Sequence, residues 1–225
     1  MLSALLFDLD GTIAHTDLLH RQTWQTVLAP YGIAVDEAFY RRYISGRLNP
    51  DIVRDVLPQL SLANGLALAE AKEAQFRALS AQLAPMPGLQ QTLAWGRARG
   101  LKQAVVSNAP GDNAHCLLDA LALAAAFSTI VLAEEASAGK PEPAPYQLAL
   151  ERLATAPAAA VAFEDSTTGI RSAVAAGIAT VGIASIHSPH DLRQAGASLV
   201  VSDFCDPQLD RWLRACVERA SPRLG

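Results

Sequence analysis

The chain has 225 residues, of which 51% are hydrophobic and 18% charged, with a formal net charge of −4 and a pI near 5.7. This composition is typical of a globular protein with a sizeable core, and it argues against long disordered segments. The sequence has no basic stripe for nucleic acid and no apolar run long enough to span a membrane, so we expect a small-molecule partner, neither nucleic acid nor membrane.

Short apolar runs alternate with helical stretches along most of the chain. We expect strands at residues 4–7, 103–106, 129–132, 159–163 and 180–183, and a closing helix at residues 207–219. Strands that alternate with helices imply a parallel sheet that is covered by helices on both faces. The pattern therefore predicts an α/β fold with three layers and a central parallel sheet.

A long helical stretch separates the first two expected strands. Helices fit residues 17–31, 36–44, 50–57 and 65–83, and the sequence Pro-Met-Pro-Gly at residues 85–88 then marks the return to the sheet. We therefore expect residues 15–84 to form an all-helical cap domain. This cap would be inserted into an α/β core domain made of residues 1–14 and 85–225.

Two carboxylates, Asp8 and Asp10, follow the first expected strand in the sequence Leu-Leu-Phe-Asp-Leu-Asp-Gly-Thr at residues 5–12. Ligands of open α/β sheets bind at the carboxyl ends of the strands, which makes both side chains candidates for catalysis. The alternative is a polar turn with Asp10 and Gly11 at its corner, because Asp-Gly favours turns by itself.

This acidic segment resembles the first signature of the haloacid dehalogenase-like phosphotransferases. Three further signatures of that family follow in order: Ser107 after the next core strand, Lys140 in a Gly-Lys-Pro loop, and the acidic pair Glu164-Asp165 after another strand. Each has a structural alternative, namely a strand-ending serine, a solvated lysine, or a helix N-cap at Asp165 or Ser166. The four together extend the resemblance over nearly the whole chain.

The resemblance implies a Rossmann-like core and a magnesium ion as cofactor. Carboxylates crowded into one crevice repel each other, by about 4 kcal/mol for two charges ~4 Å apart, and oxygen ligands of this kind suit Mg²⁺. By resemblance, the ligands would be Asp8, the backbone carbonyl of Asp10, Asp165, and Glu164 either directly or through water.

The same resemblance implies the roles of the reacting groups. Asp8 would attack phosphorus and form a phosphoryl-aspartate, while Asp10 would act first as general acid and then as general base. Ser107 and the backbone N–H of Asn108 would hold phosphate oxygens, and Lys140 would stabilise both the nucleophile and the transferring group. The implied enzyme is a phosphoric monoester hydrolase.

Three side chains of the expected cap, His20, Arg47 and Lys72, are candidates for contacting the rest of the substrate. His20 and Lys72 match in position two cap residues of β-phosphoglucomutase, although a histidine on this helix could equally be packed or at the surface. Two departures argue against mutase activity: Asn49 stands where the mutase has a phosphate-binding arginine, and Thr12 replaces a small apolar residue. Arg47 could still reach a distal anion.

The leading hypothesis is a phosphatase for a small phosphorylated metabolite, such as a sugar phosphate or phosphoglycolate. The alternatives are a β-phosphoglucomutase-like phosphomutase and a non-enzymatic sensor of a phosphorylated ligand, because a fold does not determine a function. A true dehalogenase is disfavoured, since that reaction needs neither the Asp10 proton donor nor the acidic pair. The sequence leaves the identity of the leaving group open.

The N-terminal segment also bears on the location of the protein. Residues 1–7 are apolar, lack a preceding basic residue and run directly into Asp8, which suits neither a signal peptide nor an anchor. We therefore expect a cytoplasmic enzyme, either a monomer or a weak dimer. The cysteines at positions 116, 205 and 216 include no CxxC pair, and we expect them to be small buried side chains.

Overall fold

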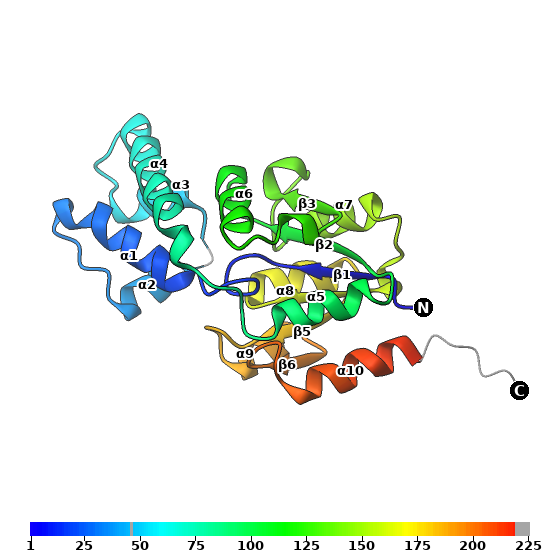
Figure 1. Ribbon diagram of the computed structural model, residues 1–225. Helices are drawn as coiled ribbons and strands as arrows, with labels where there is room; N and C mark the ends of the chain where they lie inside the picture. The colour runs from blue at the N-terminus through cyan, green and yellow to red at the C-terminus, as the bar shows by residue number, and fades with distance from the viewer. Residues whose placement is uncertain (46, 219–225) are drawn as a thin grey trace, which may run out of the picture. The chain divides into compact units, whose positions relative to one another are not determined.

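The structure, a computed structural model, describes residues 1–45 and 47–218 (Figure 1). It divides into two compact units. The core unit consists of Met1–His15 and the chain from Ala84 onward, and the helical unit is Thr16–Leu83. Among the described residues, no helix combines the length and the apolar character that a membrane span requires.

A six-stranded parallel sheet in the order β3-β2-β1-β4-β5-β6 forms the centre of the core unit. Its strands are β1 (Ala4–Phe7), β2 (Lys102–Ser107), β3 (Thr129–Leu132), β4 (Ala160–Glu164), β5 (Ala179–Ile183) and β6 (Leu199–Val201). All four residues of β1 are buried, because this strand has a neighbour on each side and cover on both faces. The α/β prediction is confirmed.

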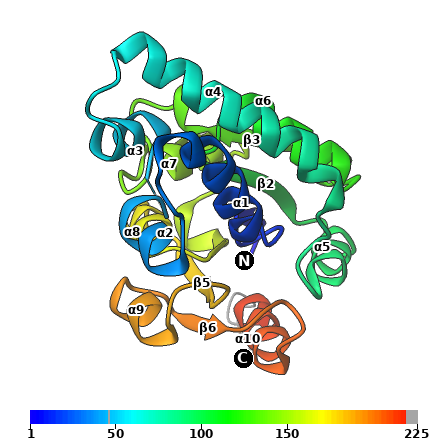
Figure 2. The ribbon, with the colours of Figure 1, turned by 90° about the vertical axis from the view of Figure 1, so that its left-hand side faces the viewer.

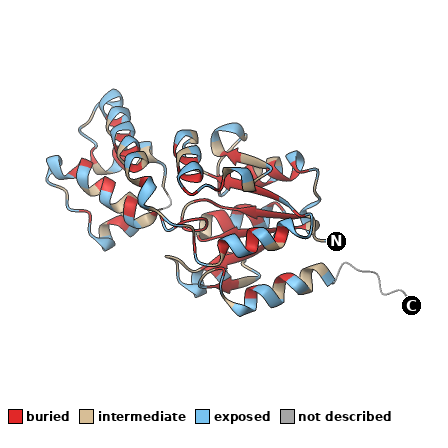
Figure 3. Cartoon of the chain, in the orientation of Figure 1, coloured by how far each residue is buried: buried red, intermediate tan, exposed pale blue. Residues whose placement is uncertain are grey.

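Helices cover the sheet on both faces. The core helices are α5 (Leu89–Arg97), α6 (Gly111–Ala120), α7 (Ala144–Arg152), α8 (Thr167–Ala175), α9 (Pro189–Gln194) and α10 (Pro207–Glu218), with short 3-10 turns at Ala124–Ala126, Ala133–Glu135 and Pro157–Ala159. Side chains of α7 and α8 pack with Leu6 on one face, whereas Gly96 of α5 lies against Leu5 on the other. Alternate residues of β1 therefore face opposite layers, and buried residues concentrate on the strands (Figure 3).

Aromatic side chains pack directly beneath the ends of the central strands. Phe7 and Phe163 stack with their ring centroids 4.8 Å apart, and Phe204 contacts both rings. Such pairs contribute about 0.5–1.5 kcal/mol beyond their buried area. Because Phe7 and Phe163 directly precede acidic residues, this packing fixes the positions from which Asp8 and Glu164 leave the sheet.

In the helical unit, the described residues form four α-helices around a core of their own. They are α1 (Asp17–Leu28), α2 (Glu37–Tyr43), α3 (Asn49–Val56) and α4 (Leu62–Leu79), with 3-10 turns at Ala29–Tyr31 and Ser80–Gln82. Trp24, Leu28 and Ile52 belong to its buried cluster, and α1 lies along α4 (Figure 2). The side chains of Asp36 and Ser61 cap α2 and α4 by accepting backbone N–H groups.

Three expectations need correction. The helix expected from residue 65 begins at Leu62, because the side chain of Ser61 caps it there. The apolar pattern did not indicate this start, since Leu62 is exposed and lies off the buried face of the helix. The three residues of β6 are too few to show a pattern, and this strand was missed. Cys205 is exposed, since it lies in the turn after Phe204, whose ring takes the buried position; Cys116 and Cys216 are only partly buried.

Gly88, directly before α5, lies close to the backbone of Phe204, and a comparison with Gly100 can test this close packing. Both glycines have left-handed backbones. A Cβ on Gly88 (φ +79°) would lie 2.4 Å from the carbonyl carbon of Phe204, whereas a Cβ on Gly100 (φ +68°) would meet no described atom within 4 Å. Either alanine variant carries about 1 kcal/mol of backbone strain. In urea unfolding, Gly88→Ala should lose ~1–3 kcal/mol more than Gly100→Ala, because backbone atoms cannot move aside. Equal losses would contradict this packing.

Candidate active site

The carboxyl ends of three adjacent strands bring the predicted core residues together. Asp8 follows β1, Ser107 ends β2, and Glu164 ends β4 with Asp165 directly after it. Since β1 lies between β2 and β4, these strand ends are neighbours at one edge of the sheet. This is the edge at which ligands bind in open α/β sheets.

Asp8, Glu164 and Asp165 form a group of buried carboxylates. One oxygen from each lies within 4.8 Å of the others, and the residues are only 7%, 0% and 6% exposed. Ionised carboxylates this close repel each other strongly when little water screens them. Their oxygen donors could together hold a metal ion, and hard donors of this kind suit divalent cations such as Mg²⁺.

Lys140 is buried beside this group, in the loop that precedes α7. Its Nζ donates to Asp8 Oδ1 (2.6 Å), to Glu164 Oε1 (2.6 Å) and to the carbonyl oxygen of Val106 (2.7 Å). An ammonium group has three protons, so these bonds engage all of them. Lys140 therefore holds the two carboxylates in place, and a direct bond to a phosphate oxygen would require one of the three bonds to break.

Asn108 fixes the backbone on either side of the Lys140 α-carbon. Its side-chain Oδ1 accepts the N–H of Lys140 (3.0 Å), and its Nδ2 donates to the carbonyl oxygen of the same residue (3.2 Å). Sequence reasoning assigned only the backbone N–H of Asn108 and missed this brace. The hydroxyl of Ser107 accepts the N–H of Ala109 at 2.9 Å.

The charges of the site shift the pKa values of its members. Burial raises the pKa of Asp8 to about 8, the charge of Glu164 adds to the rise, and Lys140 opposes it. Burial alone would lower the pKa of Lys140, but the carboxylates of Asp8 and Glu164 hold it above its usual value. A proton on Asp8 and a bound cation are thus alternative ways to neutralise the excess negative charge.

Two glycines provide the space that the carboxylates occupy. A Cβ on Gly11 would lie 2.2 Å from Asp165 Oδ2, and a Cβ on Gly169 would lie 2.0 Å from the Glu164 carboxylate. A larger residue at either position would push the carboxylate aside, so glycine at both positions lets the carboxylates lie where they do. The N-cap alternative also holds in part, because Ser166 Oγ accepts the N–H of Gly169 (3.0 Å) and caps α8.

Asp10 is partly buried in the tight turn that follows Asp8. The N–H of Gly11 donates to the carbonyl oxygen of Ala14 (2.8 Å), and Gly11 has a left-handed φ of +75°. The charge of Asp10 contributes to the raised pKa of Asp8. The turn proposed as the structural alternative is therefore present, and it holds a second carboxylate near the first.

In the helical unit, His20 and Lys72 lie in contact. Lys72 Nζ lies 2.8 Å from His20 Nδ1 and 2.9 Å from Glu73 Oε1, and the His20 ring stacks on Phe76 at 4.3 Å. Because an ammonium group only donates, His20 Nδ1 is the acceptor of this bond, and a neutral His20 carries its proton on Nε2.

Glu73 connects Lys72 to a further side chain of the helical unit. Its Oε1 also accepts a hydrogen bond from Asn49, and its contact with Lys72 was missed by the sequence reasoning. Burial opposes the shift, but Lys72 and Asn49 lower the pKa of Glu73 below its usual value, so Glu73 is ionised. Arg47 pairs instead with Asp55.

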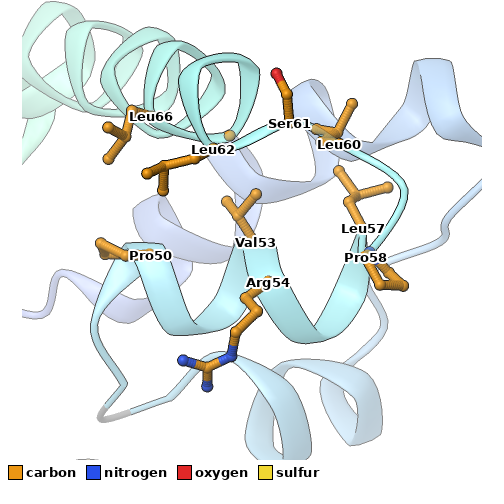
Figure 4. Close-up of a pocket in the computed structure, with 10 residues that line it drawn as sticks. Pro50, Val53, Arg54, Leu57, Pro58, Leu60, Ser61, Leu62 and Leu66 are labelled. Carbon is orange, nitrogen blue, oxygen red and sulfur yellow. The ribbon is translucent and has the colours of Figure 1, made fainter.

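The helical unit also contains an apolar pocket of about 330 Å³ between α3 and the start of α4 (Figure 4). It is lined by Pro50, Val53, Arg54, Leu57, Pro58, Leu60, Ser61, Leu62, Gly65 and Leu66. Among these described lining residues, only Arg54 has a titratable side chain, and Arg54 is paired with Asp51 and Asp55. The chemistry of the chain is therefore better placed at the sheet edge.

Comparison with known proteins identifies the family of the chain. The family model of the haloacid dehalogenase-like hydrolases matches residues 5–183. A phosphorylated carbohydrates phosphatase of Thermotoga maritima is 31% identical over 89% of this chain and 94% of its own length. Fructose-1-phosphate phosphatase YqaB of Escherichia coli is 31% identical over 80% of this chain and 96% of its own.

A solved structure resembles the chain over nearly its full length. It is CbbY from Rhodobacter sphaeroides in complex with xylulose-1,5-bisphosphate, with a TM-score of 0.81, 29% identity, and coverage of 92% of this chain and 96% of that one. The matches confirm the predicted fold class and the prediction of an enzyme that hydrolyses phosphate monoesters. Since the family model matches residues 5–183, which include Asp8, Lys140 and the acidic pair, the chain belongs to the haloacid dehalogenase-like hydrolase family.

Proposed function

We propose that the enzyme is a magnesium-dependent phosphatase that hydrolyses a small phosphorylated sugar or a related metabolite through a phosphoryl group on Asp8. The observation that carries this proposal is the group of three buried carboxylates, Asp8, Glu164 and Asp165, two of which Lys140 contacts at 2.6 Å. The relatives named for phosphorylated carbohydrates and fructose 1-phosphate support the substrate class.

The metal would be held by Asp8, the backbone carbonyl of Asp10, Asp165, and Glu164 directly or through water. Bound there, Mg²⁺ supplies the positive charge that offsets the repulsion between a carboxylate nucleophile and a phosphate ester. Lys140 holds Asp8 Oδ1, so we assign the attack on phosphorus to Oδ2. The hydroxyl of Ser107 and the N–H of Asn108 would orient the phosphate oxygens.

Asp10 would complete the reaction as acid and base. When the bond between phosphorus and the leaving oxygen breaks, Asp10 donates its proton to that oxygen. The resulting Asp10 carboxylate then takes a proton from the water that attacks the phosphoryl-aspartate. This second step releases phosphate, returns Asp8 to its free form and leaves Asp10 protonated for the next cycle.

We propose further that residues 15–84 serve as a cap and that His20, Lys72 and Arg47 recognise the rest of the substrate. Within the helical unit, Lys72 is neutralised by Glu73, and Arg47 by Asp55. A second phosphate would have to compete with these carboxylates for either cation. The group formed by His20, Lys72 and Glu73 offers both donors and acceptors, which suits the hydroxyl groups of a sugar.

Replacing the nucleophile tests the proposal most directly. Asp8→Asn should fold normally, because the raised pKa of Asp8 means that its neutral form is already tolerated at this position. Phosphate release should nevertheless fall by more than about 10³-fold, since an amide cannot form the acyl phosphate. Phosphate release from a panel of sugar phosphates with Mg²⁺ would measure the loss.

Asp210→Asn is the matched control for this variant. Asp210 forms an exposed ion pair with Arg214 on α10, so its replacement should leave turnover unchanged. Acid quench of the wild-type reaction followed by peptide mass spectrometry should find the phosphoryl group on the peptide that contains Asp8. Full activity of Asp8→Asn, or a phosphoryl group on another peptide, would exclude the assigned nucleophile.

Magnesium affinity should depend on pH because a proton and the cation compete for Asp8. With a pKa of about 8 in the metal-free protein, Asp8 must lose its proton before it can bind the ion. The apparent affinity should therefore weaken by up to about tenfold for each unit of pH below 8 and level off above it. Calorimetric titrations between about pH 6.5 and pH 8.5 would measure this, and a flat profile would contradict it.

A phosphomutase is the second candidate, favoured by the contact between His20 and Lys72, which match cap residues of β-phosphoglucomutase. Asn49 opposes a mutase, because it stands where that enzyme binds phosphate with an arginine. In this structure Asn49 instead donates a hydrogen bond to Glu73. We expect the enzyme to release phosphate from β-glucose 1-phosphate without forming glucose 6-phosphate. A coupled dehydrogenase assay detects the isomer, and its rapid formation would favour the mutase.

A further inference from the structure

Tyr146, in the first turn of α7, is completely buried and contacts the acidic group. Its hydroxyl donates to Glu164 Oε1 at 2.9 Å, and Lys140 donates to the same oxygen at 2.6 Å. The ring centroid of Tyr146 lies 5.3 Å from Lys140 Nζ, which is within the range of a cation–π contact. Tyr146 thus contacts both partners of the buried ion pair.

The two hydrogen bonds to Oε1 determine which oxygen of Glu164 remains available. Each carboxylate oxygen has two lone pairs, and those of Oε1 are used by Lys140 and Tyr146. Oε2 accepts a longer bond of 3.3 Å from the hydroxyl of Ser166. Oε2 is therefore the oxygen with the capacity to face a cation or a metal-bound water.

We propose that Tyr146 is a positioning residue for the metal site, whose hydroxyl holds Glu164 Oε1 against Lys140 and keeps Oε2 turned toward the cation. This inference rests on the proposed function, because it concerns the same magnesium site. Without the hydroxyl, Lys140 would be the remaining donor to Oε1 among those described above, and the carboxylate could rotate about its last bond. Bonds from neighbouring groups to a metal-binding carboxylate orient it in this way.

The ring and the hydroxyl of Tyr146 make different contacts, so the contribution of each can be tested separately. The ring belongs to the buried cluster that includes Leu6, Ala104 and Ala162, so it packs among aliphatic side chains. Burial, together with the charges of Glu164 and Asp8, raises the pKa of the Tyr146 hydroxyl well above its usual value. The hydroxyl therefore remains a donor, and its removal need not disturb the packing of the ring.

Tyr146→Phe tests the inference, and Tyr40→Phe is its matched control. Tyr40 is a buried tyrosine of the helical unit whose hydroxyl donates to Asp17 Oδ1 at 3.0 Å, so both variants remove a bond from a tyrosine to a carboxylate. We expect Tyr146→Phe to bind Mg²⁺ roughly 10- to 100-fold more weakly in calorimetry without substrate. Tyr40→Phe should bind Mg²⁺ as the wild type does.

Steady-state kinetics at limiting Mg²⁺ provide a second readout. Tyr146→Phe should lower kcat by a factor similar to its loss of Mg²⁺ affinity, while the KM for the phosphate ester changes by less than about twofold, because the hydroxyl does not touch the substrate. A purely structural role would instead lower the melting temperature and leave Mg²⁺ affinity unchanged. Wild-type Mg²⁺ affinity in Tyr146→Phe, with a loss confined to Tyr146→Leu, would assign the effect to ring packing and overturn the inference.

The unaltered protein offers a test that does not depend on the folding of any variant. In a protein labelled with ¹³C-tyrosine, addition of Mg²⁺ should shift the ring signals of Tyr146, since its hydroxyl bonds a carboxylate that faces the ion. Unchanged Tyr146 signals at saturating Mg²⁺ would overturn the inference. A wild-type protein that binds no Mg²⁺ would overturn the proposed function as well, whereas wild-type binding with an unaffected Tyr146→Phe would overturn the role of Tyr146 alone.

Discussion

The buried contact of Lys140 with Asp8 and Glu164 is the interaction on which the rest of the site depends. Removing a charge from water is costly, and a buried ion is retained only where partners and hydrogen bonds compensate for its desolvation. Lys140 meets this condition through its bonds to two carboxylates and a backbone carbonyl. The third carboxylate, Asp165, leaves the group with an excess of negative charge that a divalent cation can neutralise.

The fold supplies this arrangement through backbone geometry more than through side-chain choice. Parallel strands end at the same edge of a sheet, so the order β2-β1-β4 makes neighbours of groups far apart in the sequence. The space for the carboxylates exists because Gly11 and Gly169 have no Cβ. The stacked rings of Phe7 and Phe163 hold the two strand ends from below. The strand ends, the two glycines and the stacked rings therefore hold together carboxylates that repel one another.

The strands and helices that local sequence patterns could predict are the ones with long, regular patterns. The five longer strands were found because each is a continuous apolar run, while β6, with three residues, has no readable pattern. Asp8, Lys140 and the acidic pair were grouped through a family resemblance, and the structure brings these side chains together. The brace from Asn108 and the bond from Tyr146 were missed, since each joins residues whose sequence separation is unrelated to any helical or strand period.

The two buried lysines, Lys140 and Lys72, differ in the balance of charge around them, and the difference bears on what each can bind. Lys140 is outnumbered by carboxylates, so its surroundings favour a cation and, with it, a phosphate group. Lys72 forms an ion pair with Glu73, and this pair is neutral in itself. Binding a second phosphate there would mean separating a buried ion pair, which costs several kcal/mol when one charge is left uncompensated. Hydroxyl groups can bond both members without separating them, so under the proposed function we expect a sugar monophosphate in preference to a bisphosphate.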